Sequence, residues 1–433
     1  MGAMLQRLMH GLRFSLRSPA RTPRMAVVIG RLLAIAFLVC FGTGLYSHFI
    51  QDPAPWMVGL FPARPSQLYQ LTQGIHITAG ILCFPLLFGK LYSVYPALFV
   101  WPPVRSLPEL LERASIALFV AASLVQITIG LLNTYQAYQI FLFPFRQTHY
   151  ALSFVIIGSL AIHIAIKLPI INRYWTKKKS YDENGDLVVA EADRDDPLVG
   201  EIEPIPMVRN DEHELEAVGL TGRVYAWIDK TPAPRSSVTR RTLLGAIAAA
   251  SATLVAFTAG QSFRGLDSLN LFAPRKNDTG PNSLPVNRTA KAAKVIPEAT
   301  STDWQLSVVG PSGTQTFTRS QLAALPQHEV ELPIACVEGW SQSAHWKGPR
   351  VRDLMDAVGA DKNSIVRATS LEKGSIYAVS EMGPQFARDE LTLIALELNG
   401  DQLDVDHGYP ARLIAPARPG VLQTKWLSSL EAL

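Results

Sequence analysis

Cysteine is scarce in this chain, with three among 433 residues. Three cysteines are too few, and uneven in number, to form the disulfide framework of a small secreted domain, so the class of disulfide-rich secreted proteins is excluded. Cys40 and Cys83 fall within apolar segments, where a small hydrophobic side chain is the simplest interpretation. Cys336 lies alone in the polar C-terminal half, so its thiol is either buried packing or a metal ligand.

Charge is also sparse, because charged residues make up 18% of the chain and the formal net charge is +4. Lysine and arginine gather beside the apolar runs, as they do in the cytoplasmic loops of membrane proteins. No stretch combines concentrated basic residues with interleaved aromatic ones. We therefore expect no nucleic-acid partner.

Long apolar runs are what the chain has in abundance, with 48% hydrophobic residues and a mean hydropathy of +0.15. Four runs in the first part of the chain each have about the 20 residues needed to cross ~30 Å of hydrocarbon. They predict an all-α transmembrane four-helix bundle over 26–172, after a basic cytoplasmic N-terminus over 1–25. The bias of lysine and arginine places both ends of this bundle in the cytoplasm. The runs are 26–48, 67–89, 114–133 and 148–170.

The segment after the bundle changes character twice. Residues 173–238 are charged and contain proline, which predicts a cytoplasmic linker. Arg240 and Arg241 then stand directly before a fifth apolar run, so 239–260 is predicted as a fifth transmembrane helix. The arginine pair resembles a twin-arginine export signal placed internally; the alternative is two cytoplasmic arginines beside an ordinary helix. Either way the C-terminal domain is expected outside the cytoplasm.

The C-terminal third has the sequence pattern of a compact domain. Residues 261–300 are rich in asparagine, proline and small side chains, which predicts an extracytoplasmic tether. From residue 301 short β-type runs are divided by glycine and proline, with helical pieces expected near 319–325, 350–358 and 389–398. This mixture predicts a small α+β domain over 301–433.

Four histidines lie in or at the ends of the apolar runs: His48, His76, His149 and His163. Ionisable side chains in a bilayer are costly and are functional candidates by default. His149 and His163 are fourteen residues apart, about 21 Å along one helix and near one face, as two stacked haems require. Depth favours an outer haem on His48–His149 and an inner haem on His76–His163, with a single haem on His76–His149 as the alternative. One or two of the four would otherwise be packing histidines.

The bundle resembles the di-haem cytochrome b subunits of formate dehydrogenases, hydrogenases and related quinone-linked enzymes. The resemblance covers about 26–170 and depends mainly on the run that carries His149 and His163. It implies b-type haem, one or two per chain, and membrane quinone or quinol as electron partner. The chain departs from that family at Arg31, where a histidine is often found near the cytoplasmic start of the first helix.

A second set of residues indicates a metal and phosphate site. Cys336 follows a β-type run, and a strand end presents a soft thiolate ligand rigidly. Downstream come His407 in the run HGYP, then Arg412, then Lys425 in Lys-Trp. An arginine fork and a lysine point charge converging from neighbouring loops suit a phosphate. The alternative for this cluster is a solvated surface loop, and Trp340 and Trp346 near the thiol are expected to be core packing.

These residues resemble the molybdopterin-binding domain of the sulfite oxidase superfamily, over about 303–433. The resemblance implies that Cys336 ligates molybdenum and that His407, Arg412 and Lys425 hold the pterin cofactor and its phosphate. Sulfite oxidases follow the cysteine with a run that supplies a substrate-binding arginine, whereas here Val337-Glu338-Gly339-Trp340 follows. That variant is similar to the protein-methionine-sulfoxide reductase branch, whose members work with a separate haem-bearing membrane subunit.

Together these features predict a membrane-bound molybdenum-cofactor oxidoreductase. Electrons would pass between membrane quinone and an extracytoplasmic substrate through b-type haem, with oxo transfer to or from a small S-oxide or N-oxide. Two alternatives stay open. One is a sulfite-type oxidase that donates electrons to the membrane, and the other is a non-catalytic haem electron carrier.

Overall fold

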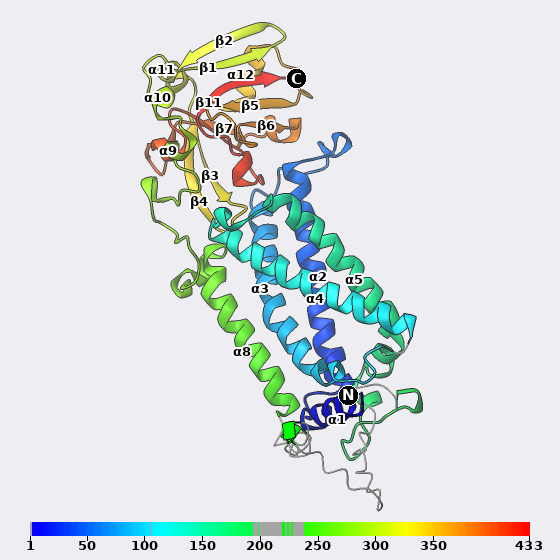
Figure 1. Cartoon of the computed structure of the whole chain (residues 1–433). Helices are drawn as coiled ribbons and strands as arrows, with labels where there is room; N and C mark the ends of the chain where they lie inside the picture. The colour runs from blue at the N-terminus through cyan, green and yellow to red at the C-terminus, as the bar shows by residue number, and fades with distance from the viewer. Residues whose placement is uncertain are drawn as a thin grey trace, which may run out of the picture. The chain divides into compact units, whose positions relative to one another are not determined.

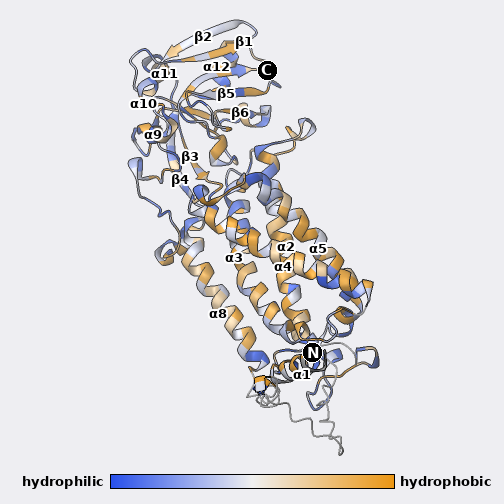
Figure 2. Ribbon diagram, viewed as in Figure 1, coloured by the Kyte–Doolittle hydropathy of each residue, from blue (hydrophilic) through white to orange (hydrophobic). Residues whose placement is uncertain are grey.

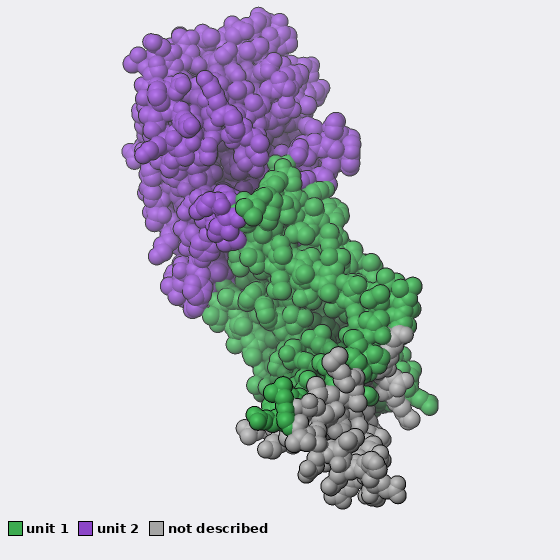
Figure 3. All heavy atoms as spheres, in the orientation of Figure 1, with its two compact units in different colours: residues 1–38, 79–131, 141–254 green, residues 39–78, 132–140, 255–433 purple. Residues whose placement is uncertain are grey.

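The computed structural model describes residues 2–104, 106–193 and 238–433, with a few single positions between 194 and 237. The linker predicted over 173–238 therefore lies largely outside the described residues. The chain divides into two compact units, coloured separately in Figure 3. Unit 1 comprises Met1–Leu38, Ala79–Leu131 and Phe141–Leu254, and unit 2 comprises Val39–Thr78, Leu132–Ile140 and Val255–Leu433.

Five helices are long and apolar enough to cross a membrane, which confirms the predicted set of four plus one. A helix satisfies its own backbone polar groups, so it is the form that such apolar runs adopt in lipid. Figure 2 shows hydrophobic residues along these helices, and large side chains such as Ile35, Leu118 and Ile162 stay more than half exposed. The five are α2 (Pro23–Gln51), α3 (Leu68–Val94), α4 (Leu107–Thr134), α5 (Phe145–Arg173) and α8 (Arg240–Thr258), and α1 (Gly2–Ser15) precedes them (Figure 1).

The helical segments of unit 1 share one apolar core. Phe37 of α2 and Phe119 of α4 meet edge to face with ring centroids 5.4 Å apart. Gly89 of α3 lets α8 approach closely, since a Cβ there would lie 2.3 Å from Cδ1 of Ile247. A side chain at Gly89 would therefore require the Ile247 side chain to move.

A five-stranded sheet forms the centre of the C-terminal part of unit 2. Its strand order is β2-β1-β11-β5-β6, and every neighbouring pair is antiparallel except β1 with β11. The helix α12 (Val351–Ala357) contributes Leu354 and Met355 to the same core as Leu306 of β1. The strands are β1 (Gln305–Gly310), β2 (Gly313–Thr318), β5 (Val366–Ser370), β6 (Val379–Met382) and β11 (Leu427–Ala432).

A second sheet, with strand order β3-β4-β8-β9, and the separate pair β10-β7 complete the α+β domain. The predicted α+β fold class is confirmed, and helices do form near two of the expected places, α11 (Arg319–Ala324) and α12. The helix expected near 389–398 is wrong, because the backbone there forms β7 and β8 and all of β7 is buried. A continuous buried run can be either helix or strand by periodicity alone. The strands are β3 (His328–Ala335), β4 (Ser341–Gly348), β7 (Leu393–Ala395), β8 (Glu397–Leu398), β9 (Asp401–Gln402) and β10 (Arg412–Ile414).

Part of the stretch predicted as a tether contributes to the core of this domain. Leu284, Ala290, Val295 and Ala299 are each at most 1% exposed. Three of them surround Trp426, whose indole Nε1 donates to the Val405 carbonyl oxygen at 2.6 Å. The segment between residues 281 and 299 is thus packed structure, although its composition resembles that of a linker.

Candidate functional site

Cys336 occupies the turn between the antiparallel strands β3 and β4. The backbone N–H of Cys336 donates to the Trp340 carbonyl at 2.8 Å, and Gly339 N–H donates to the Cys336 carbonyl at 3.0 Å. Gly339 has φ +102°, a left-handed conformation that favours glycine and closes the turn. The strand end therefore presents the thiol at a fixed place, as the sequence predicted.

The Cys336 thiol is deeply buried. It is 1% exposed and shares an apolar cluster with Leu332, Trp340 and Trp346, so the prediction of core packing for both tryptophans holds. Burial raises the pKa of the thiol well above its ordinary range, and the neighbouring Glu338 carboxyl raises that pKa further. A ligand can reach the sulfur only if one of these covering side chains moves.

Residues from the ends of α3 and α4 that belong to unit 2 contact the same turn. Gln73 Nε2 and Asn133 Nδ2 both donate to the Val337 carbonyl oxygen, at 3.3 Å and 3.2 Å. Gln136 Nε2 donates to Glu338 Oε1 at 2.6 Å, and Arg275 Nη2 donates to Gln136 Oε1 at 2.7 Å. These contacts could not be predicted from the sequence, because they join segments that are far apart along the chain.

His407, Arg412 and Lys425 are brought together as predicted. His407 Nε2 donates to the carbonyl oxygens of Pro281 and Leu284, at 2.9 Å and 3.0 Å, which leaves Nδ1 as the nitrogen with a lone pair. Arg412 Nη1 donates to the His407 carbonyl at 3.0 Å. Burial first, then Arg412 and Lys425, lower the pKa of His407 to about 4, so this ring is neutral at pH 7.

The Lys425 ammonium lies over the same turn. It donates to the carbonyl oxygens of Asp406 and Arg288, at 2.7 Å and 2.8 Å. Burial and the nearby Arg412 lower the pKa of Lys425 to about 7, while Asp406 and Cys336 raise it by smaller amounts.

Gly408 makes this convergence of side chains sterically feasible. It has φ +110°, and a Cβ on it would lie 3.0 Å from the Cβ of Arg412 and 3.1 Å from the Cβ of Lys425. Only a residue without a side chain fits between the two cations in that backbone conformation. The glycine of the HGYP run therefore has a steric reason to be there.

Two buried guanidinium groups carry positive charge that nothing in the described part of the chain neutralises. Arg412 is 1% and Arg418 3% exposed, and among the described residues neither forms an ion pair with a carboxylate. Arg412 Nε and Arg418 Nη1 also have no hydrogen-bond partner among these residues. Burial lowers the pKa of each to about 9, so both remain charged at pH 7.

Arg418 is a site residue that the sequence analysis missed. The next residue, Pro419, forms a parallel β-bridge with Ala335, which immediately precedes Cys336. Arg418 Nη2 donates to the Glu381 carbonyl at 2.8 Å. The run Ala-Arg-Pro-Gly reads as an ordinary turn, and only the bridge to the β3 end places its arginine near the thiol.

Buried cations without carboxylate partners fit an anionic group, since burying charge is favourable only with a counter-charge. Arg412, Arg418 and Lys425 suit a phosphate, and a thiolate at Cys336 suits a soft metal beside it. This combination fits a phosphate-bearing, sulfur-ligated metal cofactor of the molybdopterin type.

The four predicted haem ligands lie on three helices. His76 of α3 donates Nδ1–H to the Cys40 carbonyl at 2.9 Å, which makes Nε2 the nitrogen able to ligate a metal. Its ring lies against Gly44, where a Cβ would be 2.9 Å from Cε1. His48 is in the last turn of α2. His149 and His163 lie on α5 in unit 1, whereas His48 and His76 lie in unit 2, so the haem pairings stay predictions.

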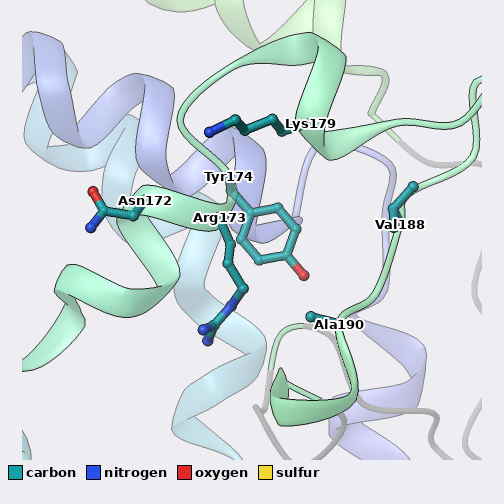
Figure 4. A pocket seen from close by; sticks show the side chains of 6 residues that line it. All are labelled: Asn172, Arg173, Tyr174, Lys179, Val188 and Ala190. Atoms are coloured by element: carbon teal, nitrogen blue, oxygen red, sulfur yellow. The ribbon is translucent and has the colours of Figure 1, made fainter.

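A separate cavity of about 360 Å³ lies in unit 1, at the end of α5 (Figure 4). Arg173 on its wall pairs with Asp193, with Nε 2.7 Å from Oδ2, and Asp193 is 1% exposed. None of the predicted site residues contributes to this cavity. It is lined by Asn172, Arg173, Tyr174, Lys179, Val188 and Ala190.

Comparison with known proteins identifies the C-terminal part. Residues 293–433 match the family described as "Oxidoreductase molybdopterin binding domain". "Sulfite oxidase, mitochondrial" of Drosophila melanogaster is 27% identical over 160 residues, which cover 31% of this chain and 28% of that protein. "Putative protein-methionine-sulfoxide reductase subunit YedZ1" of Azospira oryzae is 27% identical over 139 residues, or 31% of this chain and 51% of that protein.

A third relative, "Uncharacterized oxidoreductase YuiH" of Bacillus subtilis, is 27% identical over 132 residues, which cover 30% of this chain and 65% of that protein. The chain therefore spans between 28% and 65% of the length of these three relatives. The C-terminal part of this five-helix chain is a molybdopterin-binding oxidoreductase domain of the sulfite oxidase superfamily.

Proposed function

We propose that the chain is a membrane-bound molybdenum-cofactor oxidoreductase that passes electrons from membrane quinol, through b-type haem, to a small S-oxide or N-oxide. The observation that carries this proposal is the group of buried cations beside a buried thiol. The buried Arg412 and Arg418 and the partly buried Lys425 form no ion pair with a carboxylate among the described residues, and Pro419, which follows Arg418, bridges to Ala335, which precedes Cys336. Such a site is complete only with an anion in it.

Each residue has a stated role in this proposal. Cys336 ligates molybdenum; Arg412, Arg418 and Lys425 hold the phosphate and the pterin; and neutral His407 fixes the HGYP turn through its two carbonyl contacts. When bound, the cofactor supplies two-electron oxygen-atom transfer. A sulfoxide with two electrons and two protons gives a sulfide and one water, and oxidation of one quinol to quinone supplies both electrons and both protons.

Glu338, two residues after Cys336, favours an uncharged substrate. Glu338 is 7% exposed, and the run Val337-Glu338-Gly339-Trp340-Ser341 that follows Cys336 contains no arginine. An anionic sulfite gains nothing from a carboxyl group, whereas an uncharged S-oxide or N-oxide does not need a cation there. Hydrogen bonds through Gln136 link Arg275 to this carboxyl group. The positive charge of Arg275 is the one feature that supports the alternative of a sulfite-type oxidase.

The haem relay is supported by the intramembrane histidines. His76 has the Nδ1–H to carbonyl contact that orients metal-ligating imidazoles. The proposed pairs are His48–His149 for an outer haem and His76–His163 for an inner one, with one haem on His76–His149 as the alternative arrangement.

The proposed topology has a cytoplasmic N-terminus and an extracytoplasmic C-terminal domain that follows the fifth helix. Arg240 begins α8 and lies over the Tyr181 ring, 4.3 Å from its centroid. We expect replacement of Arg240 and Arg241 by lysine to block export by the twin-arginine route, as measured by protease protection of the domain in spheroplasts. Normal export of that variant would favour an ordinary fifth helix.

Elemental analysis and visible spectroscopy of the detergent-solubilised chain test the proposal. We expect molybdenum and haem in the same protein, haem reduction by a quinol analogue, and reoxidation by dimethyl sulfoxide. A Cys336→Ser variant should lose sulfoxide turnover and keep its haem absorbance. Haem without molybdenum would indicate the electron carrier, and haem reduction by sulfite would indicate the sulfite-type oxidase.

A further inference from the structure

Two amide side chains from the ends of α3 and α4 meet at one backbone atom beside the thiol. Gln73 Nε2 and Asn133 Nδ2 donate to the Val337 carbonyl oxygen, which has two lone pairs and is thereby saturated. Val337 directly follows Cys336 in the turn. We call Gln73 and Asn133 the amide clamp.

The clamp is held in place at a cost. Gln73 is 6% exposed, and its Oε1 has no hydrogen-bond partner among the residues that the structure describes. A buried acceptor without a hydrogen bond lowers the stability of the fold. We therefore attribute the fixed position of the Gln73 amide to the hydrogen bond that its Nε2 donates to the Val337 carbonyl. Asn133 is 7% exposed and fixed from the other side, since its Oδ1 accepts from the Tyr138 hydroxyl at 2.9 Å.

The rest of the turn is restrained as well. A Cβ at Gly339 would lie 3.1 Å from Cγ1 of Ile77, so α3 packs directly against the turn. Ser262 donates its hydroxyl to the Gly339 carbonyl, and the Ser341 hydroxyl donates to the Ser262 carbonyl at 3.2 Å. The Cys336 turn is therefore held from α3, from α4 and from the segment after α8.

The clamp also links the thiol to a histidine-bearing helix. Gln73 and Ile77 flank His76 on α3, three residues before it and one residue after it. A short path of covalent and hydrogen bonds thus runs from the His76 helix through Gln73 to the Val337 carbonyl and on to Cys336. His76 itself is tied to α2 through the Cys40 carbonyl.

We propose that Gln73 and Asn133 are positioning residues for electron entry, which hold the Cys336 turn in the geometry that accepts electrons from the haem bundle. This inference rests on the proposed function. Among the described residues, neither Gln73 nor Asn133 forms a side-chain hydrogen bond to the cations or to the thiol, and the clamp acts through the Val337 carbonyl. Its role is in the transfer of electrons between two redox centres, and no bond to oxygen is made or broken there.

The test compares two routes of electron supply in the full-length, cofactor-loaded chain. The variants are Gln73→Met, Asn133→Leu and the double substitution, which remove the donors and keep similar volumes. Reduced benzyl viologen supplies electrons to the molybdenum site directly, whereas a quinol analogue supplies them through haem. Gln51→Met is the matched control, because Gln51 lies at the end of α2 and donates to the Ser47 carbonyl at 2.7 Å.

We expect haem reoxidation by dimethyl sulfoxide, followed by stopped-flow absorbance, to slow by about 10- to 100-fold in the double variant, the range for a misplaced reacting group. Viologen-driven turnover and the haem spectrum should stay at native levels. Amide hydrogen exchange of the segment from Cys336 to Trp340 should become faster in the same variant. The control should match the native chain in all of these measurements.

Native haem reoxidation in the double variant would overturn the inference, as would equal losses on both electron routes, which would place the clamp in the molybdenum site itself. The single variants give the same comparison if the double variant does not fold. A native chain without haem absorbance would overturn the proposed function and this inference together, whereas an unaffected haem-containing variant overturns the inference alone.

Discussion

Replacing Arg412 with methionine should separate folding of the C-terminal domain from cofactor binding. Burial lowers the pKa of Arg412 to about 9, which corresponds to a penalty on its charged form on the order of 4–5 kcal/mol. Its bonds to the carbonyls of His407 and Gln423 return about 1.5–3 kcal/mol each. These opposing contributions nearly cancel, so we expect Arg412→Met to change the stability of the cofactor-free chain by less than about 2 kcal/mol.

Cofactor binding should respond differently, because Arg412 Nε has no partner among the described residues and is available to an anion. One charge-assisted hydrogen bond to a phosphate is worth about 1.5–3 kcal/mol, so affinity should fall by about 10- to 100-fold. Methionine fills a similar volume and still packs on Trp346, whose ring centroid is 4.9 Å from the guanidinium carbon. The loss of affinity would therefore reflect the missing charge and donors.

Molybdenum content per haem, measured by elemental analysis, and thermal unfolding of the cofactor-free chain check this prediction. Arg367→Met is the control in the same domain, because Arg367 is a half-exposed residue of β5 that pairs with Glu381 and Glu431. Surface ion pairs contribute little to stability, so breaking these two should leave molybdenum content unchanged. Native molybdenum content in Arg412→Met would refute the argument that buried, unpaired cations hold the cofactor.

Three further predictions concern other parts of the molecule. His149→Ala and His163→Ala should each reduce haem absorbance, whereas the exposed His345→Ala should not; unchanged spectra in the first two would remove both residues as ligands. Because burial lowers the pKa of Lys425 to about 7, the cofactor-free unfolded chain binds more protons than the folded one above that pH. Stability should therefore rise from about pH 7 to about pH 9, and thermal unfolding should show a smaller slope for Lys425→Met; equal slopes would contradict the shift. Gly408→Ala places a side chain at φ +110° between two cations, at a strain of about 1–3 kcal/mol, so molybdenum content should fall while haem absorbance stays native.

Structural features that depend on short stretches of sequence could be predicted. The five apolar helices follow from run length alone, and Cys336 at a strand end follows from a β-type run that stops at a Gly-Trp turn. The convergence of His407, Arg412 and Lys425 was predicted from their order, and the structure adds Gly408 as the steric reason for it. Each of these depends on neighbours within about twenty residues.

Features that depend on long-range contacts were not predictable from one sequence. Arg418 becomes a site residue only through the bridge between Pro419 and Ala335, and Gln73 only through a bond to a residue 264 positions away. The short side chains between residues 281 and 299 resemble a tether, yet they fill a core that other segments build. The region near 389–398 was misjudged because a fully buried strand lacks the alternation that would identify it.

The position of β11 has a consequence for biogenesis. This strand follows all other elements of its domain in the chain, yet it lies between β1 and β5 in the middle of the sheet, directly after Lys425 and Trp426. The central sheet cannot close until the ribosome has released every one of its strands. Any step that needs the closed sheet must therefore follow synthesis of β11, and any machinery that moves this domain must either wait for that strand or handle an open sheet.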